Sequence, residues 1–230
     1  MKKQLGSALI IVLVILVLVT LIGTLAVRSG ILGLKLATNS QVSALLLENS
    51  DSALFNIENP DQVARQLALD GMFAYFNSSA NADDELVFCY RAAQASFYSF
   101  SKASAITEDG STTKIRVDGF CKANQFAMGR SAVLSQVYLT KNATTSTPFA
   151  GVPKGTSLGQ SNVPVTMHNI GATVISVLPS FAGATTTQIE NCFKQRASAV
   201  GACFDGLGIP YNMQHSDYVV GGQPKLMKLI

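Results

Sequence analysis

The longest apolar run in the chain lies near its amino terminus, between Ser7 and Val27. It carries no charged residue, and its polar positions are Ser7, Thr20 and Thr24. A helix needs about twenty consecutive apolar residues to cross the hydrocarbon core of a bilayer. Because lipid offers no hydrogen-bond partners for backbone groups, a lone span has to be helical. The pattern therefore predicts a transmembrane helix over residues 7–27.

The helical pattern continues beyond this run. No proline occurs between Met1 and Asn59, so no residue removes a backbone donor or clashes with the preceding turn. Apolar residues recur near helical spacing at Ile31, Leu34, Val42, Leu45, Leu46 and Leu54. The sequence predicts one helix over residues 7–56, about 75 Å long at 1.5 Å per residue. The pair Asn59-Pro60 marks its end.

The remainder of the chain shows short alternating segments separated by turn residues. A second amphipathic helix is predicted over Asp61–Asn77, and a short helix or turn over Gln188–Ala199. Strands are predicted over Glu85–Arg91, Thr113–Phe120, Ser131–Thr140, Val163–Met167, Thr173–Leu178 and Tyr218–Val220, with a further extended segment around Phe97, Phe100 and Ile106. Loops or turns are predicted over Asn77–Asp84, Thr107–Gly110, Asn142–Gln160 and Gly201–Pro210. The sum is an α+β fold, in which a long amino-terminal helix packs on an antiparallel sheet in a head over residues 60–230.

Composition permits a globular head but points to no charged ligand. The chain has 230 residues, of which 48% are hydrophobic and 13% charged, and the head alone is long enough to bury a core. The formal net charge of +3 is too small to imply nucleic acid as an obligatory partner. Six cations gather in one third of the chain, at Arg91, Lys102, Lys114, Arg116, Lys122 and Arg130. A strip that contacts DNA phosphates and ordinary solvated strand faces both explain them, and we favour the second.

All four cysteines follow the apolar run, at Cys89, Cys121, Cys192 and Cys203. An even number on the exported side of a membrane indicates two disulfides in an oxidising compartment. Four cysteines allow three pairings, and we favour Cys89–Cys121 with Cys192–Cys203 because each closes a short local loop. A zinc site is disfavoured, since the sequence has no C-x-x-C pair and only two histidines.

Motifs for catalysis are weak in this sequence. His215 lies near Asp217, but no nucleophile motif accompanies them, and His168 stands alone. Lys154-Gly155-Thr156 lacks the upstream glycine spacing of a phosphate-binding loop. We therefore expect neither an enzyme nor a protein that holds a cofactor or metal.

Composition alone leaves three interpretations of the amino terminus. A cleaved secretory signal has an apolar core of roughly 7–15 residues and a small-residue cleavage site, which Thr24–Ala26 would supply. A plain membrane anchor would keep Lys2 and Lys3 on the cytoplasmic side. The third interpretation rests on a resemblance: two lysines, a glycine and an uninterrupted apolar helix resemble the type III signal of type IV pilins and pseudopilins. The resemblance implies that a prepilin peptidase cuts after Gly6, removes residues 1–6 as a leader peptide and methylates Ser7.

The segment from Gly6 to Leu54 resembles more narrowly the amino-terminal region of the PilX family of minor pilins. Ser50 and Asp51 depart from the alanines that are usual near the end of that helix. The positions that match the family pattern are Gly6, Ala8, Leu9, Thr20, Leu21, Gly23, Asn39, Glu48 and Leu54. The resemblance implies a pilin-like fold, with an assembly helix that includes Ala8, Leu9, Ile10, Thr20 and Gly23.

We assign Ile10 to the position at which major pilins carry a glutamate. A carboxylate in lipid is costly, and the family tolerates it because it pairs with the terminal amine of a neighbouring subunit. Loss of this glutamate is typical of PilX proteins and of the K-type minor pseudopilins of type II secretion systems, both of which resemble tip subunits. The resemblance therefore implies a place at or near the tip of a fibre.

The function implied by the resemblance is pilus assembly. Such a protein lies in the bacterial inner membrane with a periplasmic carboxy-terminal domain, joins a priming complex and supports twitching motility, adhesion and DNA uptake. The implied partners are other minor pilins, the major pilin, the prepilin peptidase and an inner-membrane platform protein. Two alternatives stay open: a tip minor pseudopilin of a type II secretion system, and a membrane-anchored periplasmic binding domain.

Overall fold

The computed structural model describes residues 5–59, 72–94, 99–129, 132–141, 167–181 and 183–221. The chain divides into two compact units, Met1–Ala44 and Leu45–Ile230. One helix, α1 (Leu5–Ile57), forms the described part of the first unit and the first turns of the second. The prediction of a single helix over residues 7–56 is therefore confirmed.

Between residues 9 and 27, α1 is apolar except at Thr20 and Thr24, and both hydroxyl groups are satisfied within the helix. Thr20 donates to the carbonyl oxygen of Val17 at 2.8 Å, and Thr24 donates to that of Leu21 at 2.8 Å. Within the described residues, α1 alone is long and apolar enough to cross a membrane, with a mean hydropathy of 3.2 in its most apolar window. Because no hydroxyl there needs water, the helix meets the hydrogen-bonding demand of lipid.

The second unit is built on a five-stranded antiparallel sheet with the strand order β2-β1-β3-β4-β5. The strands are β1 (Glu85–Tyr90), β2 (Ser104–Ile106), β3 (Leu134–Lys141), β4 (Met167–Val177) and β5 (Tyr211–Gly221). The α+β arrangement of a long apolar helix and an antiparallel sheet is thus confirmed, as are the strands predicted over Glu85–Arg91 and Ser131–Thr140.

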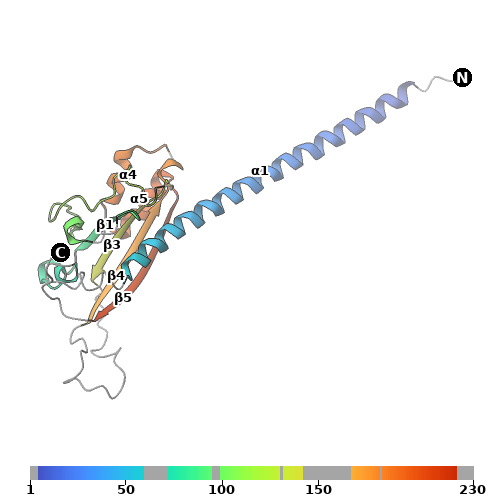
Figure 1. Cartoon of the computed structure of the whole chain (residues 1–230). Helices are drawn as coiled ribbons and strands as arrows, with labels where there is room; N and C mark the ends of the chain where they lie inside the picture. Colours follow the sequence, from blue (N-terminus) through green and yellow to red (C-terminus); the bar gives the residue numbers. More distant parts are fainter. Residues whose placement is uncertain are drawn as a thin grey trace, which may run out of the picture. The chain divides into compact units, whose positions relative to one another are not determined.

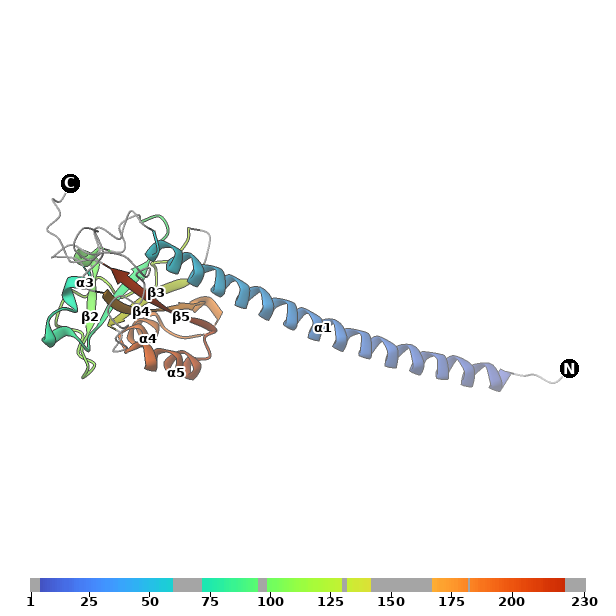
Figure 2. The ribbon, with the colours of Figure 1, turned by 90° about the horizontal axis from the view of Figure 1, so that it is seen from below.

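Both faces of the sheet are covered by helices, which explains why its central strands are buried throughout. Along β1, Leu86 and Phe88 pack on the last turns of α1, whereas Val87 points to the opposite face. That opposite face is covered by α4 (Thr186–Phe193) and α5 (Ala197–Leu207). Figures 1 and 2 show these two helices on one side of the sheet and the end of α1 on the other.

Short helical turns fill the connections: α3 (Met72–Tyr75), η1 (Ser79–Asn81), η2 (Phe100–Lys102) and η3 (Pro179–Phe181). Of the helix predicted over Asp61–Asn77, residues 72–75 are helical and residues 61–71 lie outside the described residues. The predicted loop Asn142–Gln160 and residues 163–166 also lie outside them. The predicted turn Thr107–Gly110 is confirmed, because Gly110 has a φ of 83° and donates to the Thr107 carbonyl oxygen at 2.9 Å.

The strand predicted over Thr113–Phe120 is wrong, because the backbone there lies across the sheet and does not extend it. The Gly119 N–H donates to Ser104 Oγ at 2.9 Å. A Cβ at Gly119 would overlap the Val87 carbonyl oxygen and the Ser104 backbone nitrogen. Val87 and Ser104 are paired between β1 and β2, so Gly119 lies directly over that pair. The alternation of Ile115 and Val117 was too short to specify pairing.

The predicted loop Gly201–Pro210 is also wrong, since residues up to Leu207 belong to α5. Two of the glycines have a structural role in α5 or at its end. A Cβ at Gly201 would lie 2.9 Å from Tyr211 Oη, so a bare backbone is needed for α5 to pack on β5. Gly208, with a φ of 68°, ends the helix in the left-handed conformation.

The break predicted between Met167 and Thr173 does not exist, and the two segments form one strand, β4. Gly171 lies within this strand. A Cβ at this position would lie 2.9 Å from His215 Cε1 and 3.0 Å from Thr140 Oγ1, so the glycine makes room for side chains on β5 and β3. The predicted short strand Tyr218–Val220 is likewise part of the longer β5.

Candidate functional site

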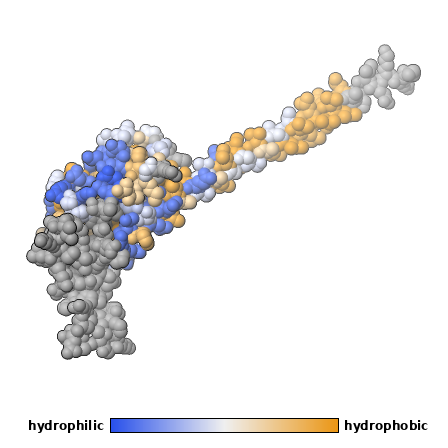
Figure 3. Space-filling model, in the orientation of Figure 1, coloured by the Kyte–Doolittle hydropathy of each residue, from blue (hydrophilic) through white to orange (hydrophobic). Residues whose placement is uncertain are grey.

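The most unusual surface of the chain is the apolar surface of α1 over residues 9–36. Its large apolar side chains are exposed, from 46% at Val17 to 72% at Leu9. Figure 3 shows this stretch mainly as hydrophobic surface, interrupted by paler and hydrophilic atoms. Apolar surface left in water costs about 25 cal/mol per Å². Lipid or the apolar helices of other molecules are therefore its natural surroundings.

The predicted assembly residues all lie on this helix. Leu9 is 72% and Ile10 65% exposed, Thr20 turns its hydroxyl back to its own helix, and a Cβ at Gly23 would meet nothing within 4 Å. Gly6, Ser7 and Ala8 are helical in backbone, and their side chains lie outside the described ones. The structure therefore places these residues on one helix, and among the described side chains it joins none of them to another element by a hydrogen bond.

The glutamate position of major pilins needs a correction of one residue. The fifth residue after Gly6 is Ile11, not Ile10 as the sequence analysis assigned it. Both residues are isoleucines, and Ile11 is 56% exposed. The corrected position, like Ile10, carries no carboxylate.

In the second unit, the last turns of α1 are bound to the sheet by both apolar and polar contacts. Ala53 and Leu54 lie in the same buried cluster as the apolar face of β1. Ser50 donates to Ser176 on β4 at 2.8 Å, and the two are buried. Ser52 shares a hydrogen bond of 2.6 Å with the Tyr90 hydroxyl at the end of β1. These bonds fix both the height and the rotation of α1 on the sheet.

The four cysteines form two disulfides, Cys89–Cys121 and Cys192–Cys203, which are the pairs that short loop closure favours. They close 32 and 11 residues of chain. The first attaches the irregular segment after Gly119 to β1, and the second joins α4 to α5. Each disulfide therefore holds a covering element on the same face of the sheet.

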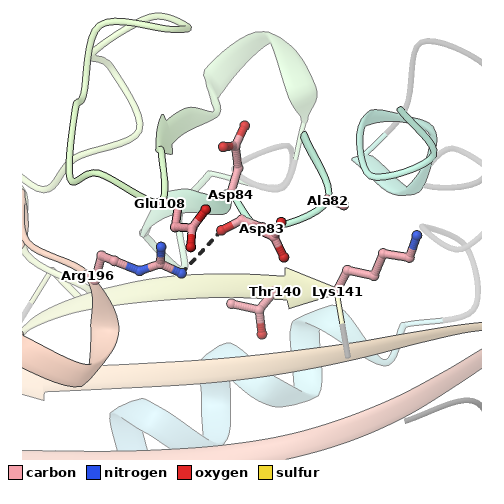
Figure 4. Close-up of a pocket in the computed structure, with 7 residues that line it drawn as sticks. All are labelled: Ala82, Asp83, Asp84, Glu108, Thr140, Lys141 and Arg196. Atoms are coloured by element: carbon pink, nitrogen blue, oxygen red, sulfur yellow. Dashed lines mark hydrogen bonds between the residues drawn. The ribbon is translucent and has the colours of Figure 1, made fainter. Parts of the chain in front are cut away.

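A polar pocket of about 380 Å³ lies at one end of the sheet. Its lining, shown in Figure 4, consists of Ala82, Asp83, Asp84, Glu108, Thr140, Lys141 and Arg196. Arg196 donates through Nη2 to the Asp83 carbonyl oxygen at 3.2 Å and through Nε to buried Glu85 at 3.1 Å. Glu85 also accepts from the Ala197 N–H at 2.8 Å, at the amino terminus of α5.

A second ion pair borders the same pocket. Lys114 Nζ lies 2.6 Å from Asp84 Oδ2, and the Tyr75 hydroxyl donates to the same oxygen at 2.5 Å. Burial raises the pKa of Tyr75 above its ordinary value, and its hydrogen bond to Asp84 adds to this rise. Among the described residues no cluster of three or more metal-ligating side chains occurs. The pocket's charged groups thus hold β1, α5 and the connecting segments together, and we assign it a structural role.

His215 lies on the edge strand β5, between two polar side chains. Thr173 Oγ1 lies 2.8 Å from its Nδ1, and Asp217 Oδ1 lies 3.1 Å from its Nε2. In a serine-protease triad the two ring nitrogens have the reverse partners, with Nε2 toward the nucleophile and Nδ1 toward the carboxylate. The arrangement therefore gives no support for nucleophilic catalysis.

The cations considered as a DNA-binding strip are partly engaged within the head. Lys114 is paired with Asp84, and Arg116 donates to the Ser101 carbonyl oxygen at 2.8 Å. Arg130 lies outside the described residues. These contacts favour the interpretation that they are ordinary surface cations.

The groups that organise the head, above all Glu85 and Arg196, carry no signal in the sequence. These two residues are 111 positions apart, and neither is part of a motif. A partner at that distance leaves no periodic or spacing signal in a single sequence. No family model matches the chain, and neither a curated protein nor a solved structure matches it.

Proposed function

We propose that this protein is a minor pilin of the PilX kind. In this proposal it is held in the bacterial inner membrane by α1, with the second unit in the periplasm. It primes pilus assembly with other minor pilins and then lies at or near the fibre tip. Twitching motility, adhesion and DNA uptake depend on it through the fibre.

One observation carries the proposal. A single helix, α1, has an exposed apolar surface over residues 9–36, and its last turns form part of the core of a disulfide-bonded α+β head. A helix that served only as an anchor has no need to continue into the core of the head. A pilin uses the same helix for membrane retention, for packing in the fibre and for carrying its head.

Processing after Gly6 is the first test. We expect the mature protein to begin at Ser7 with a methylated amino terminus, as measured by the mass of its amino-terminal peptide. The variant Gly6→Val is expected to keep residues 1–6 and to fail in assembly. Gly30→Ala is the matched control, since a Cβ there meets nothing within 4 Å. A mature protein that keeps Lys2 and Lys3, or begins beyond Val27, would contradict the proposal.

Deletion of the gene tests the system to which the protein belongs. We expect loss of twitching and of surface pili, with restoration by the intact chain. Normal twitching with blocked secretion of exoproteins would instead assign the chain to a type II secretion system. Normal pili and normal secretion would leave an anchored domain and would end the proposal.

A further inference from the structure

The last strand of the sheet, β5, is a long edge strand without the usual protection. Among the described strands it pairs with β4 alone, at 11 consecutive positions without a bulge (Figure 1). Natural sheets protect a long edge with lysine, proline or a bulge. Neither lysine nor proline occurs in β5. An edge of this kind can take up a further strand through its backbone groups.

One hydrogen bond at the start of β5 shows which of its backbone groups point outward. The Leu178 N–H donates to the carbonyl oxygen of the opposite residue, Pro210, at 3.2 Å, so the two form a hydrogen-bonded pair. Hydrogen-bonded and non-bonded pairs alternate in an antiparallel ladder. The backbone groups of Tyr211, Met213 and His215 therefore point away from β4. Among the described residues, none of these groups bonds to another segment.

The side chains along this part of the edge combine one apolar group with two anions. Because side chains alternate between the faces of a strand, Tyr211, Met213 and His215 lie on the face that α5 covers. Met213 is 41% exposed. The Tyr211 hydroxyl donates to Asp205 at 3.2 Å, and His215 Nε2 lies 3.1 Å from Asp217. Both carboxylates are exposed, so an anion lies on either side of the apolar side chain along the strand.

The sequence around this edge is acidic. No lysine or arginine occurs from residue 197 to residue 221, where the acidic residues are Asp205 and Asp217. Asp205 also lies in the last turn of α5, where the negative end of the helix dipole disfavours a carboxylate. A cation placed beside Asp205 would offset this unfavourable interaction. The edge is therefore complementary to positive charge.

We propose that the outward edge formed by Tyr211, Met213 and His215 binds an extended, cationic segment of another protein as a further strand. The added strand runs antiparallel to β5, and its residues opposite these three carry a cation, an apolar side chain and a cation. Its backbone hydrogen bonds supply attraction, and its apolar side chain covers Met213. Its two cations face Asp205 and Asp217 and so select the segment. This inference goes beyond the proposed function and holds equally for a pilin and for an anchored domain.

Binding of synthetic peptides to the full chain in detergent tests the proposal. The probe is a fluorescein-labelled peptide of sequence TKTVTKT, in which lysines flank a valine at alternate positions, and fluorescence anisotropy measures its dissociation constant. The control peptide TETVTET has glutamate in place of lysine. We expect the lysine peptide to bind at least about tenfold more tightly, because two attractive contacts replace two repulsive ones. The peptide TKTPTKT, in which proline removes the central backbone donor, is expected not to bind.

Variants of the chain locate the site. Met213→Pro removes an outward N–H, which an edge strand tolerates, and is expected to abolish binding of TKTVTKT. Met213→Thr keeps this N–H and is the matched control. Asp205→Asn with Asp217→Asn is expected to reduce the preference for lysine over glutamate to less than about threefold. Glu48→Gln with Asp51→Asn removes two exposed carboxylates elsewhere in the second unit and should leave the preference unchanged.

Equal binding of the lysine and glutamate peptides, or no binding of either, would overturn the inference. Binding that Met213→Pro leaves intact would do the same; if circular dichroism shows that this variant does not fold, binding of TKTPTKT as tight as that of TKTVTKT is the equivalent contrary result. Binding that appears only in a chain ending at Gly221 would assign the edge to the chain's own residues 222–230. Self-association that Met213→Pro abolishes, without peptide binding, would assign the edge to a second copy. Either of these last two results would reject an external segment.

Discussion

At the scale of single residues, buried Glu85 connects three parts of the head. It begins β1, accepts from Arg196 at 3.1 Å and accepts from the Ala197 N–H at 2.8 Å. A carboxylate at the amino terminus of a helix is stabilised by the helix dipole and by the free N–H groups there. This one side chain therefore fixes the start of α5 over the sheet.

We predict that Glu85→Gln destabilises the protein by about 1–3 kcal/mol, because it removes charge-assisted hydrogen bonds at a buried position. Urea unfolding of the full chain in detergent measures the change. Glu108→Gln, at an exposed position in the same pocket, is the control and is expected to change stability by less than about 0.5 kcal/mol. Equal effects of the two substitutions would show that Glu85 has no special role.

Tyr218 on β5 donates a hydrogen bond to Glu58 at the end of α1, and its pKa is raised. Burial raises its pKa to about 12, and the hydrogen bond to Glu58 adds to this rise while that of Ser216 opposes it. The folded protein thus favours the protonated phenol. Its contribution to stability is complete below the ordinary tyrosine pKa, about 10, and is lost as the pH rises toward 12.

We accordingly predict that the thermal midpoint of the full chain falls between neutral pH and about pH 11. In Tyr218→Phe this alkaline loss is expected to be smaller, because one phenol no longer ionises. In Glu58→Gln it should also be smaller and end at lower pH, since the hydrogen bond and charge of Glu58 no longer add to the rise of the Tyr218 pKa. An unchanged pH profile in both variants would contradict the assignment.

At the scale of elements, the segment after β2 is held to the sheet by a glycine and a disulfide. Gly119 lies on the Val87–Ser104 pair, and Cys121, two residues later, is bonded to Cys89 of β1. The Cys121 N–H also donates to buried Gln136 on β3 at 2.8 Å. The segment therefore acts as a cover for β1 and β2, although it has no regular secondary structure.

We predict that Gly119→Ala lowers the free energy of unfolding by about 3 kcal/mol, since the added methyl overlaps two backbone groups that cannot move independently. The control is Gly129→Ala, at which a Cβ meets nothing within 4 Å. Denaturant unfolding of both variants measures the two free energies of unfolding to be compared. A Gly119→Ala protein as stable as the control would mean that the segment is displaced without cost.

Prediction from the sequence succeeded where one strong pattern determined the outcome. The uninterrupted apolar periodicity gave α1, and buried runs such as Glu85–Arg91 gave strands. It failed around Gly201 and Gly171, because the close approach of another element to a glycine cannot be seen in one sequence. It failed again at Thr113–Phe120, because alternation alone does not say whether a neighbouring strand is available.

At the scale of the whole molecule, the two units have opposite surfaces. The first unit exposes its apolar residues over 9–36, whereas the second unit buries a core of two clusters on either side of the sheet. The two units therefore need different surroundings, and a membrane beside an aqueous compartment provides both.

We predict that Leu16→Asp weakens membrane retention of the chain, because a carboxylate near the centre of a span costs about 2.5–3.5 kcal/mol. Carbonate extraction of membranes, followed by detection of the chain in pellet and supernatant, measures the effect. Leu47→Asp changes an exposed leucine of the second unit and should leave retention unaltered. Equal retention of both variants would remove the membrane role of α1.

The hydroxyl groups that Thr20 and Thr24 turn back on their own helix have a consequence for motion. Those groups are satisfied internally and aliphatic side chains lie on every side, so lipid favours no rotational orientation of the helix over residues 9–27. The helix can rotate about its axis without desolvating a polar group. Its rotational orientation is therefore set by contacts made beyond residue 27. Arg28 is the first charged side chain after Lys3, so it is the first point at which an approaching neighbour can set that angle.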